Sequence, residues 1–379
     1  MLIERSEDIR RLADILLDTP QVAVDTESNS LYAYKEQVCL VQFSITQGDY
    51  LVDPLAVGKE EMQQLASIFA AENIEKIFHA AEYDLICLSR DFGFRFVNLF
   101  DTMWAASVVG WEEIGLGDIL ERLFHVKVDK RYQRADWGKR PLSAKLLDYA
   151  RQDTHYLIPL CSELKAQLQQ MQRLALAQED FYQLCRINGE KHSNFNSVEW
   201  VKQQAALTAQ TQQFSSRQAA VLQELYLYRQ RIAQQFNQPV YKIIPERVLL
   251  CLAATPPRER SALQQLCGLG SNLAHSFSDG MFQSIQRGLQ MQLSSIANAP
   301  QKPTYDEQTQ KRYEALKRWR KNTAQQLGVK SDVVLPKTML ETLARTNPNT
   351  LEELHHLLKD YPNRIERFAQ SIIQVLSQV

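Results

Sequence analysis

Apolar and polar residues change their period several times along the first 172 residues of the chain. Four stretches carry the apolar and β-branched runs typical of strands, and five carry the apolar spacing of amphipathic helices. The predicted strands are residues 21–28, 37–45, 49–54 and 74–80, and the predicted helices are residues 60–72, 81–93, 100–110, 116–126 and 144–172. Three strands in a hairpin meander, followed by alternating strands and helices, predict an α/β domain with a mixed sheet flanked by helices.

The pattern changes near residue 200, where strand-like stretches almost disappear and Gln-rich amphipathic helices follow. Within this part, residues 228–245 align without a gap to residues 319–336, at an offset of 91 positions. The match extends to apolar, Arg and Pro positions on both sides, which chance similarity in a Gln-rich chain does not explain. We therefore predict two copies of one small all-α domain after the α/β domain, with domains at residues 1–200, 208–292 and 302–379.

Composition places the chain among soluble globular proteins. Its 379 residues are 45% apolar and 23% charged, which suits two or three domains with cores of their own. No apolar run approaches the roughly 18 residues of a membrane span, and the N-terminal residues lack the pattern of a secretory signal. The six cysteines form no CxxC pair, which is typical of free thiols. We therefore expect a cytoplasmic protein with no membrane contact.

The net charge of −1 conceals two halves of opposite sign. Residues 201–379 hold 22 Lys and Arg against 13 Asp and Glu, whereas residues 1–200 hold 21 against 31. Such asymmetry favours an acidic catalytic unit joined to a basic unit that faces a polyanion. Ordinary variation in surface composition would give similar numbers, so charge alone does not decide.

Four carboxylates and one tyrosine lie in three separated segments of the predicted α/β domain. Asp25 and Glu27 are two residues apart on a strand, so both side chains project from one face. Tyr149 and Asp153 are four apart on one face of a helix, and Asp84 lies near the start of another helix. Gathered carboxylates repel one another unless a cation neutralises them, and hard oxygen ligands select Mg²⁺ or Mn²⁺ over zinc. Two such ions about 4 Å apart can hydrolyse a phosphodiester.

Each of these segments alone has an ordinary structural interpretation. Acidic pairs are common at strand ends, and Asp84 alone would serve as a helix cap. Tyr149 and Asp153 alone would form a solvated helix face. The combination of all three segments, in this order and on these element types, favours a metal-dependent nuclease.

The three segments resemble the motifs of the DEDDy class of 3′→5′ exonucleases, which are Asp-x-Glu, an Asp on a helix and Tyr-x-x-x-Asp. All five positions are present. The stretches CLVQFS, FHAAEYDL and DKRYQRADWGKRPLSAKLLDYARQD are similar to ribonuclease D, and the duplicated unit resembles the HRDC domain that ribonuclease D shares with certain helicases. The resemblance implies a ribonuclease H-like fold and two divalent metal ions, Mg²⁺ or Mn²⁺, as cofactors.

The resemblance also implies a role for each residue. Asp25, Glu27 and Asp153 would hold the ion that activates the attacking water. Asp25 with Asp84 would hold the second ion, near the leaving oxygen. Tyr149 would position the water, and cleavage would release nucleoside 5′-monophosphates. We expect a monomeric exoribonuclease that trims the 3′ ends of structured RNA such as tRNA precursors.

A basic segment, residues 122–145, leads into the helix that carries Tyr149. Its cations are candidates for phosphate contact, with Lys130 and Arg140 preferred, and Trp137 would offer a ring for base stacking. The alternative is that Trp137 anchors the segment to the core while the charges are solvated.

The two repeats contain a second set of candidates for RNA binding. Arg229 and Arg320 lie beside aromatic residues in a pattern typical of nucleic-acid surfaces. The aromatic residues, Tyr228 and Trp319, recur at one repeat position, which suits a place in the core.

Rival interpretations remain open on the sequence alone. The same five residues would serve a DNA 3′→5′ exonuclease of proofreading or repair type, because no motif displays recognition of a 2′-hydroxyl. A non-catalytic nucleic-acid-binding protein that retained the fold would be expected to lack a carboxylate, and none is missing. The C-terminal half would also suit a docking module for a protein partner.

Overall fold

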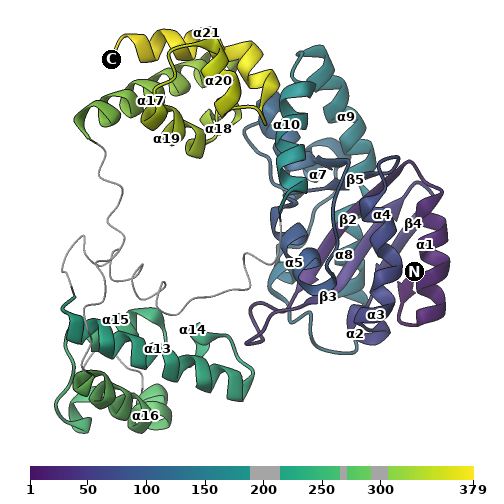
Figure 1. The fold of residues 1–379 in the computed structure, drawn as a ribbon. Coiled ribbons are helices and arrows are strands. Elements are labelled where there is room, and N and C mark those ends of the chain that lie inside the picture. The colour runs from purple at the N-terminus through teal and green to yellow at the C-terminus, as the bar shows by residue number, and fades with distance from the viewer. Residues whose placement is uncertain (188–213, 265–270, 292–305) are drawn as a thin grey trace. The chain divides into compact units, whose positions relative to one another are not determined.

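The computed structural model describes residues 1–187, 214–264, 271–291 and 306–379 (Figure 1). These residues form two compact units. One unit contains residues 1–28, 38–187 and 306–379, and the other contains residues 29–37, 214–264 and 271–291.

A six-stranded mixed sheet forms the centre of the first unit. Its strands are β1 (Leu2–Ile3), β2 (Gln21–Ser28), β3 (Val38–Ile45), β4 (Gly48–Val52), β5 (Glu75–Phe78) and β6 (Leu99–Asp101), in the spatial order β1-β4-β3-β2-β5-β6. The pairs β2–β3 and β3–β4 are antiparallel, whereas β1–β4, β2–β5 and β5–β6 are parallel. The predicted meander is β2-β3-β4, and the predicted mixed sheet is confirmed.

Helices flank this sheet. They are α1 (Ser6–Leu17), α2 (Pro54–Val57), α3 (Lys59–Met62), α4 (Ala66–Ala70), α5 (Glu82–Phe92), α6 (Thr102–Val109), α7 (Leu116–Phe124), α8 (Ala144–His155), α9 (Leu157–Gln170) and α10 (Leu174–Cys185), with 3₁₀ turns at Gln63–Leu65 and Lys130–Arg134. All eight residues of β3 are buried, since the strand lies between β4 and β2 and beneath α8. The centre of the sheet is therefore a rigid platform for the elements that pack on it.

Local structure differs from the sequence prediction at several places, of which three bear on the sheet and its flanking helices. Residues 60–72 form the short helices α3 and α4 around a 3₁₀ turn rather than one helix. The residues Leu99–Asp101 form a strand that the prediction did not contain, because their pairing with β5 is a tertiary contact and three residues are too few to show a period. The amphipathic helix α1, which buries Ile9, Leu12 and Leu16, was also missing from the prediction.

The second unit is a small helical domain. Its helices are α13 (Ser216–Phe236), α14 (Val240–Ile243), α15 (Glu246–Ala254) and α16 (Ser271–Gln290), with a 3₁₀ turn at Arg260–Gln264. A capping box between Ser215 and Gln218 begins α13. α13 and α16 pack so closely that a Cβ at Gly280 would overlap the ring of Tyr228. Residues 29–37 belong to this unit, and the Tyr241 hydroxyl donates to the carbonyl of Leu31 at 3.2 Å.

A second helical domain of the same plan belongs to the first unit. Its helices are α17 (Glu307–Leu327), α18 (Ser331–Val334), α19 (Lys337–Thr346), α20 (Leu351–Leu357) and α21 (Pro362–Ser377). The helices α17, α18, α19 and α21 begin 91 residues after α13, α14, α15 and α16 respectively. Tyr228 and Trp319 pack in the corresponding cores. The repeat in the sequence is therefore a repeat of structure.

Two arginines at equivalent repeat positions make equivalent hydrogen bonds. Nη1 of Arg229 donates to the carbonyl of Ile244 at 3.3 Å, and Nη1 of Arg320 donates to the carbonyl of Leu335 at 2.8 Å. Arg229 is only 3% exposed, and the side chain of Arg320 is 14% exposed. Each guanidinium holds the end of a short helix against the first helix of its domain, and this placement favours a structural role over the predicted RNA contacts.

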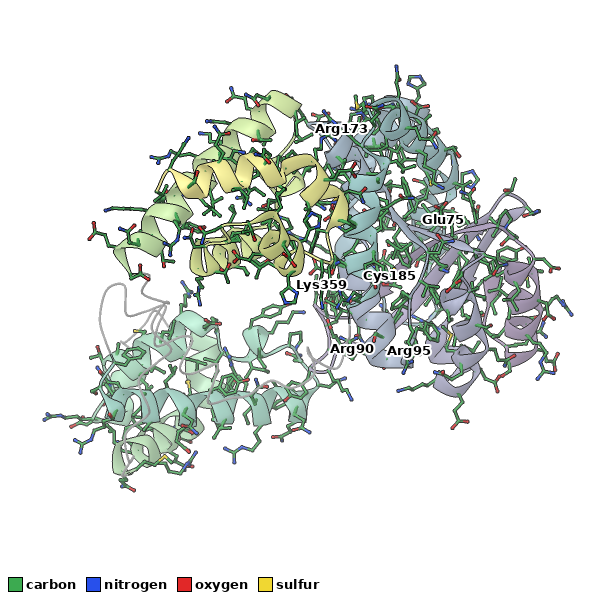
Figure 2. The ribbon with its side chains drawn as sticks, turned by 45° about the horizontal axis from the view of Figure 1, so that its top comes forward. Glu75, Arg90, Arg95, Arg173, Cys185 and Lys359 are labelled. Carbon is green, nitrogen blue, oxygen red and sulfur yellow. The ribbon has the colours of Figure 1, made fainter. Side chains whose placement is uncertain are left out.

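The C-terminal helical domain packs against the α/β domain. Arg173, labelled at this junction in Figure 2, donates to the carbonyls of Val108 and Leu327 at 2.9 and 2.7 Å. Gly110 has a φ of 106°, and a Cβ at this position would overlap the carbonyl of Gly328. A left-handed backbone and the close approach of two segments of the chain thus both require glycine at position 110.

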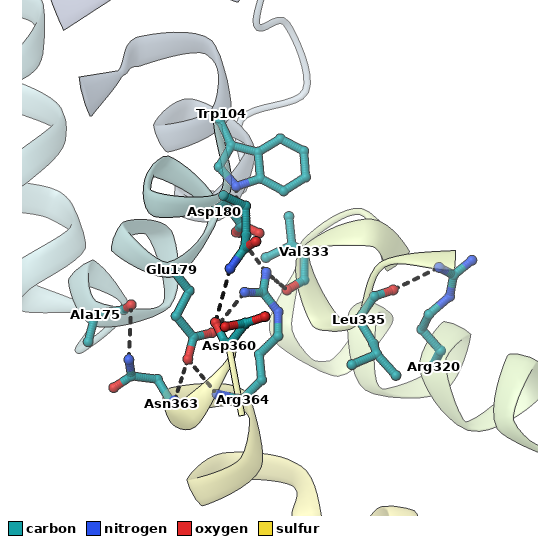
Figure 3. A network of polar contacts seen from close by, with 11 residues as sticks. Trp104, Ala175, Glu179, Asp180, Arg320, Val333, Leu335, Asp360, Asn363 and Arg364 are labelled. Carbon is teal, nitrogen blue, oxygen red and sulfur yellow. Dashed lines mark hydrogen bonds and ion pairs between the residues drawn. The ribbon is translucent and has the colours of Figure 1, made fainter. Parts of the chain in front are cut away.

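A buried ion-pair network fixes the same junction (Figure 3). Arg364 of α21 is 0% exposed, and its guanidinium lies 2.9 Å from Glu179 Oε2 and 2.7 Å from Asp180 Oδ2 of α10. It also donates to the carbonyl of Val333 at 3.0 Å. Asp180 in turn accepts from Trp104 Nε1 at 2.6 Å. Both carboxylates contact one cation, so this charge is buried with partners rather than alone.

Two further expectations concern membrane spans and thiols. Within the described ranges, every helix is too short or too polar to cross a membrane. Among the residues that the structure describes, Cys39, Cys87, Cys161 and Cys185 form no disulfide bond, as predicted, whereas Cys251 is disulfide-bonded, which corrects the prediction of a free thiol there. Cys267 lies outside the described residues.

Candidate metal-dependent active site

The first two candidate ligands lie near the end of β2. Asp25 and Glu27 alternate with Thr26 on the strand, so the two carboxylates share one face of the sheet. Asp25 is opposite Gln42 on β3, Glu27 is opposite Leu40, and the register shifts after Glu27. The central strands therefore set the spacing of both carboxylates.

The helix α8 packs on β2, β3 and β4 and brings the second pair of residues. Tyr149 and Asp153, one helical turn apart, are 6% and 8% exposed. The Tyr149 hydroxyl is hydrogen-bonded to the Asp153 carboxylate. The next residue, Thr154, places its Oγ1 2.7 Å from Ser44 Oγ on β3, which fixes the helix to the strand.

Asp84 lies in the first turn of α5, after a tight turn that follows β5. The turn contains Ala80 at a φ of 65°, and the Asp101 carboxylate accepts from the backbone N–H groups of Ala80 and Ala81 at 3.2 and 2.8 Å. Asp84 is 6% exposed and accepts a hydrogen bond from the Thr26 hydroxyl. Asp101 thus holds the turn that aims Asp84 at the end of β2.

The structure brings three of the four predicted carboxylates into one cluster. One ligand oxygen from each of Asp25, Glu27 and Asp153 lies within 4.8 Å of the other two. Asp84 lies outside this cluster but close enough to raise the pKa of Glu27 and Asp153 through its charge. The set contains only hard oxygen donors, which fits a divalent cation of the Mg²⁺ class.

Electrostatics confirm that these carboxylates are crowded. Burial raises the pKa of Asp25 and Glu27 well above their usual range, and the charges of their acidic neighbours raise it further. Burial, followed by the charge of Asp25, does the same for Asp84. Burial raises the pKa of Asp153 to about 7, although its hydrogen bond from Tyr149 opposes this shift. A bound cation would favour the ionised form of all four.

The cluster opens into a cavity of about 410 Å³. Its lining comprises Asp25, Thr26, Glu27, His79, Gly115, Leu116, Gly117, Asp118, Val128, Lys130, Gln133, Tyr149 and Asp153. Lys130, a predicted RNA contact, lies at this cavity with its side chain 65% exposed and 3.5 Å from Asp118. Its position suits contact with a phosphate that approaches the carboxylates.

The other two candidates of the basic segment are packed into the α/β domain. Trp137 is 1% exposed and its ring lies 6.2 Å from that of Tyr149, so it has no free face for a base. Arg140 forms a bidentate pair with the buried Asp53 at 2.6 and 2.7 Å and donates to the carbonyl of Cys39. These placements favour structural roles for both residues, in which Trp137 supports the catalytic tyrosine.

Sequence reasoning passed over several polar residues at this site. Thr26 bonds Asp84, and His79 lines the cavity with its Nδ1 2.9 Å from Thr102 Oγ1. Gln42 is buried opposite Asp25. Gln42 left a signal, since it is a long polar residue in the middle of an otherwise apolar strand, whereas Thr26 and His79 acquire their partners only through tertiary contacts.

Comparison with protein families agrees with this geometry. Residues 1–169 match the model of the 3′-5′ exonuclease domain, and residues 218–285 and 309–376 each match the HRDC domain. The chain therefore consists of a DEDD-type 3′-5′ exonuclease domain followed by HRDC domains, and divalent-metal dependence is a property of this exonuclease family.

Individual relatives also support this family assignment. The chain is 32% identical over 266 residues to the exosome complex exonuclease RRP6 of Saccharomyces cerevisiae, which covers 68% of the chain and 36% of that protein. It is 31% identical over 269 residues to the exosome complex component 10 homolog of Caenorhabditis elegans, covering 70% of the chain and 30% of that protein. The chain thus spans about a third of the length of these curated relatives.

Two solved structures share the fold. The catalytic core of RRP6 from Trypanosoma brucei has a TM-score of 0.65 at 28% identity, covering 76% of the chain and 79% of that structure. Escherichia coli RNase D, an exoribonuclease involved in structured RNA processing, has a TM-score of 0.71 at 21% identity, covering 95% of the chain and 99% of that structure. The second likeness is one of fold.

Proposed function

The chain belongs to the family of 3′-5′ exonucleases with HRDC domains that includes Rrp6, and on this premise we propose that it removes nucleotides stepwise from the 3′ end of RNA. The observation that carries the proposal is the convergence of Asp25, Glu27 and Asp153 within 4.8 Å beneath α8. The relative named exosome complex exonuclease RRP6, and the fold shared with the exoribonuclease RNase D, are in keeping with RNA as the polymer.

The residues of the site have different roles in this reaction. Asp25, Glu27 and Asp153 would hold one divalent ion, and Asp25 with Asp84 would hold a second. When bound, two ions of the Mg²⁺ or Mn²⁺ class supply an activated water and stabilise the leaving 3′-oxygen. Lys130 at the cavity contacts a phosphate of the substrate strand.

Tyr149 acts as a hydrogen-bond donor. A phenol with an ordinary pKa of about 10 is protonated at neutral pH, and burial raises the pKa of Tyr149 further. Its hydroxyl donates to Asp153 at the cavity, and its oxygen accepts from the attacking water and so positions it. The product of each step is a nucleoside 5′-monophosphate.

The natural substrate that we propose is structured RNA with a single-stranded 3′ tail, such as a tRNA precursor. A cavity of this size accepts the end of a strand rather than a duplex, and the C-terminal half, which contains the helical domains, carries the excess of Lys and Arg over Asp and Glu. We further propose that the protein acts as a monomer in the cytoplasm, as the sequence predicts.

The test is a digestion of 5′-labelled RNA that carries a short 3′ extension, with and without Mg²⁺. We expect a ladder that shortens from the 3′ end, needs the metal and stops on chelation. A matched DNA strand in the same tube decides between polymers, since equal degradation of DNA would favour the repair-type alternative. Intact RNA that still binds the protein would favour a non-catalytic role.

The assignment of the site is tested with Asp153→Asn. We expect the cleavage rate to fall at least about 100-fold, equivalent to about 2.7 kcal/mol of barrier. Asp148→Asn is the matched control, because Asp148 lies on the same helix and is exposed. Its carboxylate forms an ion pair with Arg151 at 2.6 Å. Wild-type cleavage by the Asp153 variant would show that the site is assigned wrongly.

A further inference from the structure

One polar side chain on the catalytic face has no role in the arrangement described so far. Gln42 lies in the middle of β3, and its exposed fraction is 0%. Neither Nε2 nor Oε1 of Gln42 has a hydrogen-bond partner within the part of the chain that the structure describes. Burying an amide without partners costs free energy that a methionine or leucine of similar size would avoid. A core position of this kind calls for a reason other than packing.

The sheet places Gln42 beside the acidic cluster. Gln42 is directly opposite Asp25 on β2 and directly opposite Leu51 on β4. Directly opposite residues project from the same face of a sheet, with Cβ atoms about 4.5–5.5 Å apart. The amide therefore lies on the face that α8 covers with Tyr149 and Asp153.

Among the neighbouring side chains on this face, a carboxylate is the hydrogen-bond partner that remains for Gln42. Leu40 and Leu51 are apolar, and the Ser44 hydroxyl is already hydrogen-bonded at 2.7 Å to Asp49 Oδ1. The polar group directly across the ladder is the carboxylate of Asp25. An amide N–H donates to a carboxylate oxygen, and such a bond is stronger when the carboxylate is ionised.

We propose that Gln42 is a positioning residue of the metal site: once a divalent ion binds, its Nε2 donates to the ionised Asp25 carboxylate and fixes the orientation of that carboxylate toward the ion. The inference rests on the proposed function, because Asp25 needs an orientation only if it ligates a metal. Carboxylate ligands are generally held by outer hydrogen-bond partners, and the loss of such a partner typically costs about 10- to 100-fold in metal affinity or activity. Gln42 supplies this partner from β3, a strand whose eight residues are all buried.

The experiment is a Mn²⁺ titration of the wild-type chain and of the Gln42→Met variant, with free Mn²⁺ measured by electron paramagnetic resonance. Methionine matches glutamine in length and fills the same space without donating. We expect Mn²⁺ to bind the variant about 10- to 100-fold more weakly. Thermal unfolding without metal should occur at the same temperature or higher, because an unpaired amide has been removed.

A second readout separates positioning from structure. RNA affinity measured in Ca²⁺ should be unchanged in Gln42→Met, cleavage at limiting Mn²⁺ should fall, and excess Mn²⁺ should restore most of the rate. Val41→Ala is the control, since it perturbs the same strand from the opposite face. It should lower the unfolding temperature and leave Mn²⁺ affinity within twofold of wild type. Wild-type Mn²⁺ affinity in Gln42→Met would overturn the inference.

A measurement on the wild-type chain covers the case in which Gln42→Met does not fold. On saturation with diamagnetic Mg²⁺, the side-chain NH₂ signals of Gln42 in a ¹⁵N spectrum should shift and exchange more slowly with solvent. Unchanged signals at saturation would overturn the inference. Absence of both Mn²⁺ binding and RNA cleavage in wild type would instead refute the proposed function, so the two failures are distinct.

Discussion

The ionisation of the acidic cluster couples stability to pH at the level of single residues. Burial raises the pKa of Asp153 to about 7 in the folded chain, against about 3.9 in an unfolded one. Between these values the folded state binds more protons than the unfolded state, so stability falls as pH rises. The contribution is complete below about pH 4 and is lost as pH passes about 7.

We therefore predict that the metal-free chain unfolds at a lower temperature at pH 8 than at pH 5, and that Mg²⁺ raises the unfolding temperature more at pH 8. Calorimetric scans at both pH values, with and without Mg²⁺, measure this. In Asp153→Asn the pH dependence should shrink, because the titrating group is gone. An Mg²⁺ effect that was larger at pH 5 would contradict the prediction.

The second prediction at this scale concerns the hydroxyl of Tyr149. Its ring packs near Trp137 and Tyr132, at centroid distances of 6.2 and 5.8 Å, and phenylalanine keeps both contacts. Tyr149→Phe should lower kcat by about 100-fold and leave RNA affinity unchanged, since the hydroxyl acts on the reacting groups. Single-turnover rates and binding in Ca²⁺ separate the two quantities. A loss of affinity as large as the loss of rate would give the hydroxyl a binding role instead.

At the scale of elements, the junction between α10 and α21 depends on one buried cation. Removing Arg364 leaves Glu179 and Asp180 in a site where both are largely buried, with one partner fewer. Arg364→Leu should cost about 3–5 kcal/mol and expose the C-terminal helical domain to proteolysis. Arg367→Leu is the matched control, because Arg367 is exposed on the same helix. Equal unfolding temperatures for the two variants would show that the network does not hold the junction.

An element can be predicted from the sequence when the residues that define it lie within the element itself. The strands β2 to β5 were predictable because their apolar runs and the turn residues that bound them lie within each segment. The helix α5 was predictable because its apolar spacing and the glycine at position 93, which ends it, are adjacent in the sequence. The strand β6 was not, since three residues carry no period and only pairing with β5 defines them. The repeat was predictable because a 91-residue offset recurs in the chain itself.

The candidate site divides in the same way. Motif spacing placed the carboxylates on the correct elements, and the sheet then set their distances. The roles of Trp137 and Arg140 were not accessible, because the partner of Arg140 is Asp53, 87 residues away, and a basic side chain looks the same in sequence whether it is paired or free. A cationic segment therefore indicates an RNA-binding surface only after the cations that form buried ion pairs have been identified.

At the scale of the whole molecule, the acidic site must receive a polyanion. The exonuclease half carries the excess of Asp and Glu, and residues 201–379 carry the excess of Lys and Arg. Exposed cations on the helical domains would raise the local concentration of RNA and offset its repulsion from the carboxylates. Because Arg320 is bonded to the carbonyl of Leu335, the cations available on α17 are its exposed neighbours, Arg318 and Lys321.

We predict that the double variant Arg318→Ser, Lys321→Ser weakens binding of tailed RNA and lowers the salt slope of that binding by about 1 per lost phosphate contact. Cleavage of a saturating short oligonucleotide should be unchanged, since neither residue lines the catalytic cavity. The control is Lys311→Ser with Lys337→Ser, which removes the same charge from lysines that pair with Glu307 and Glu341. Affinity measured across a series of salt concentrations distinguishes the two pairs. Equal slopes for both double variants would mean that net charge, and not this face of α17, attracts the RNA.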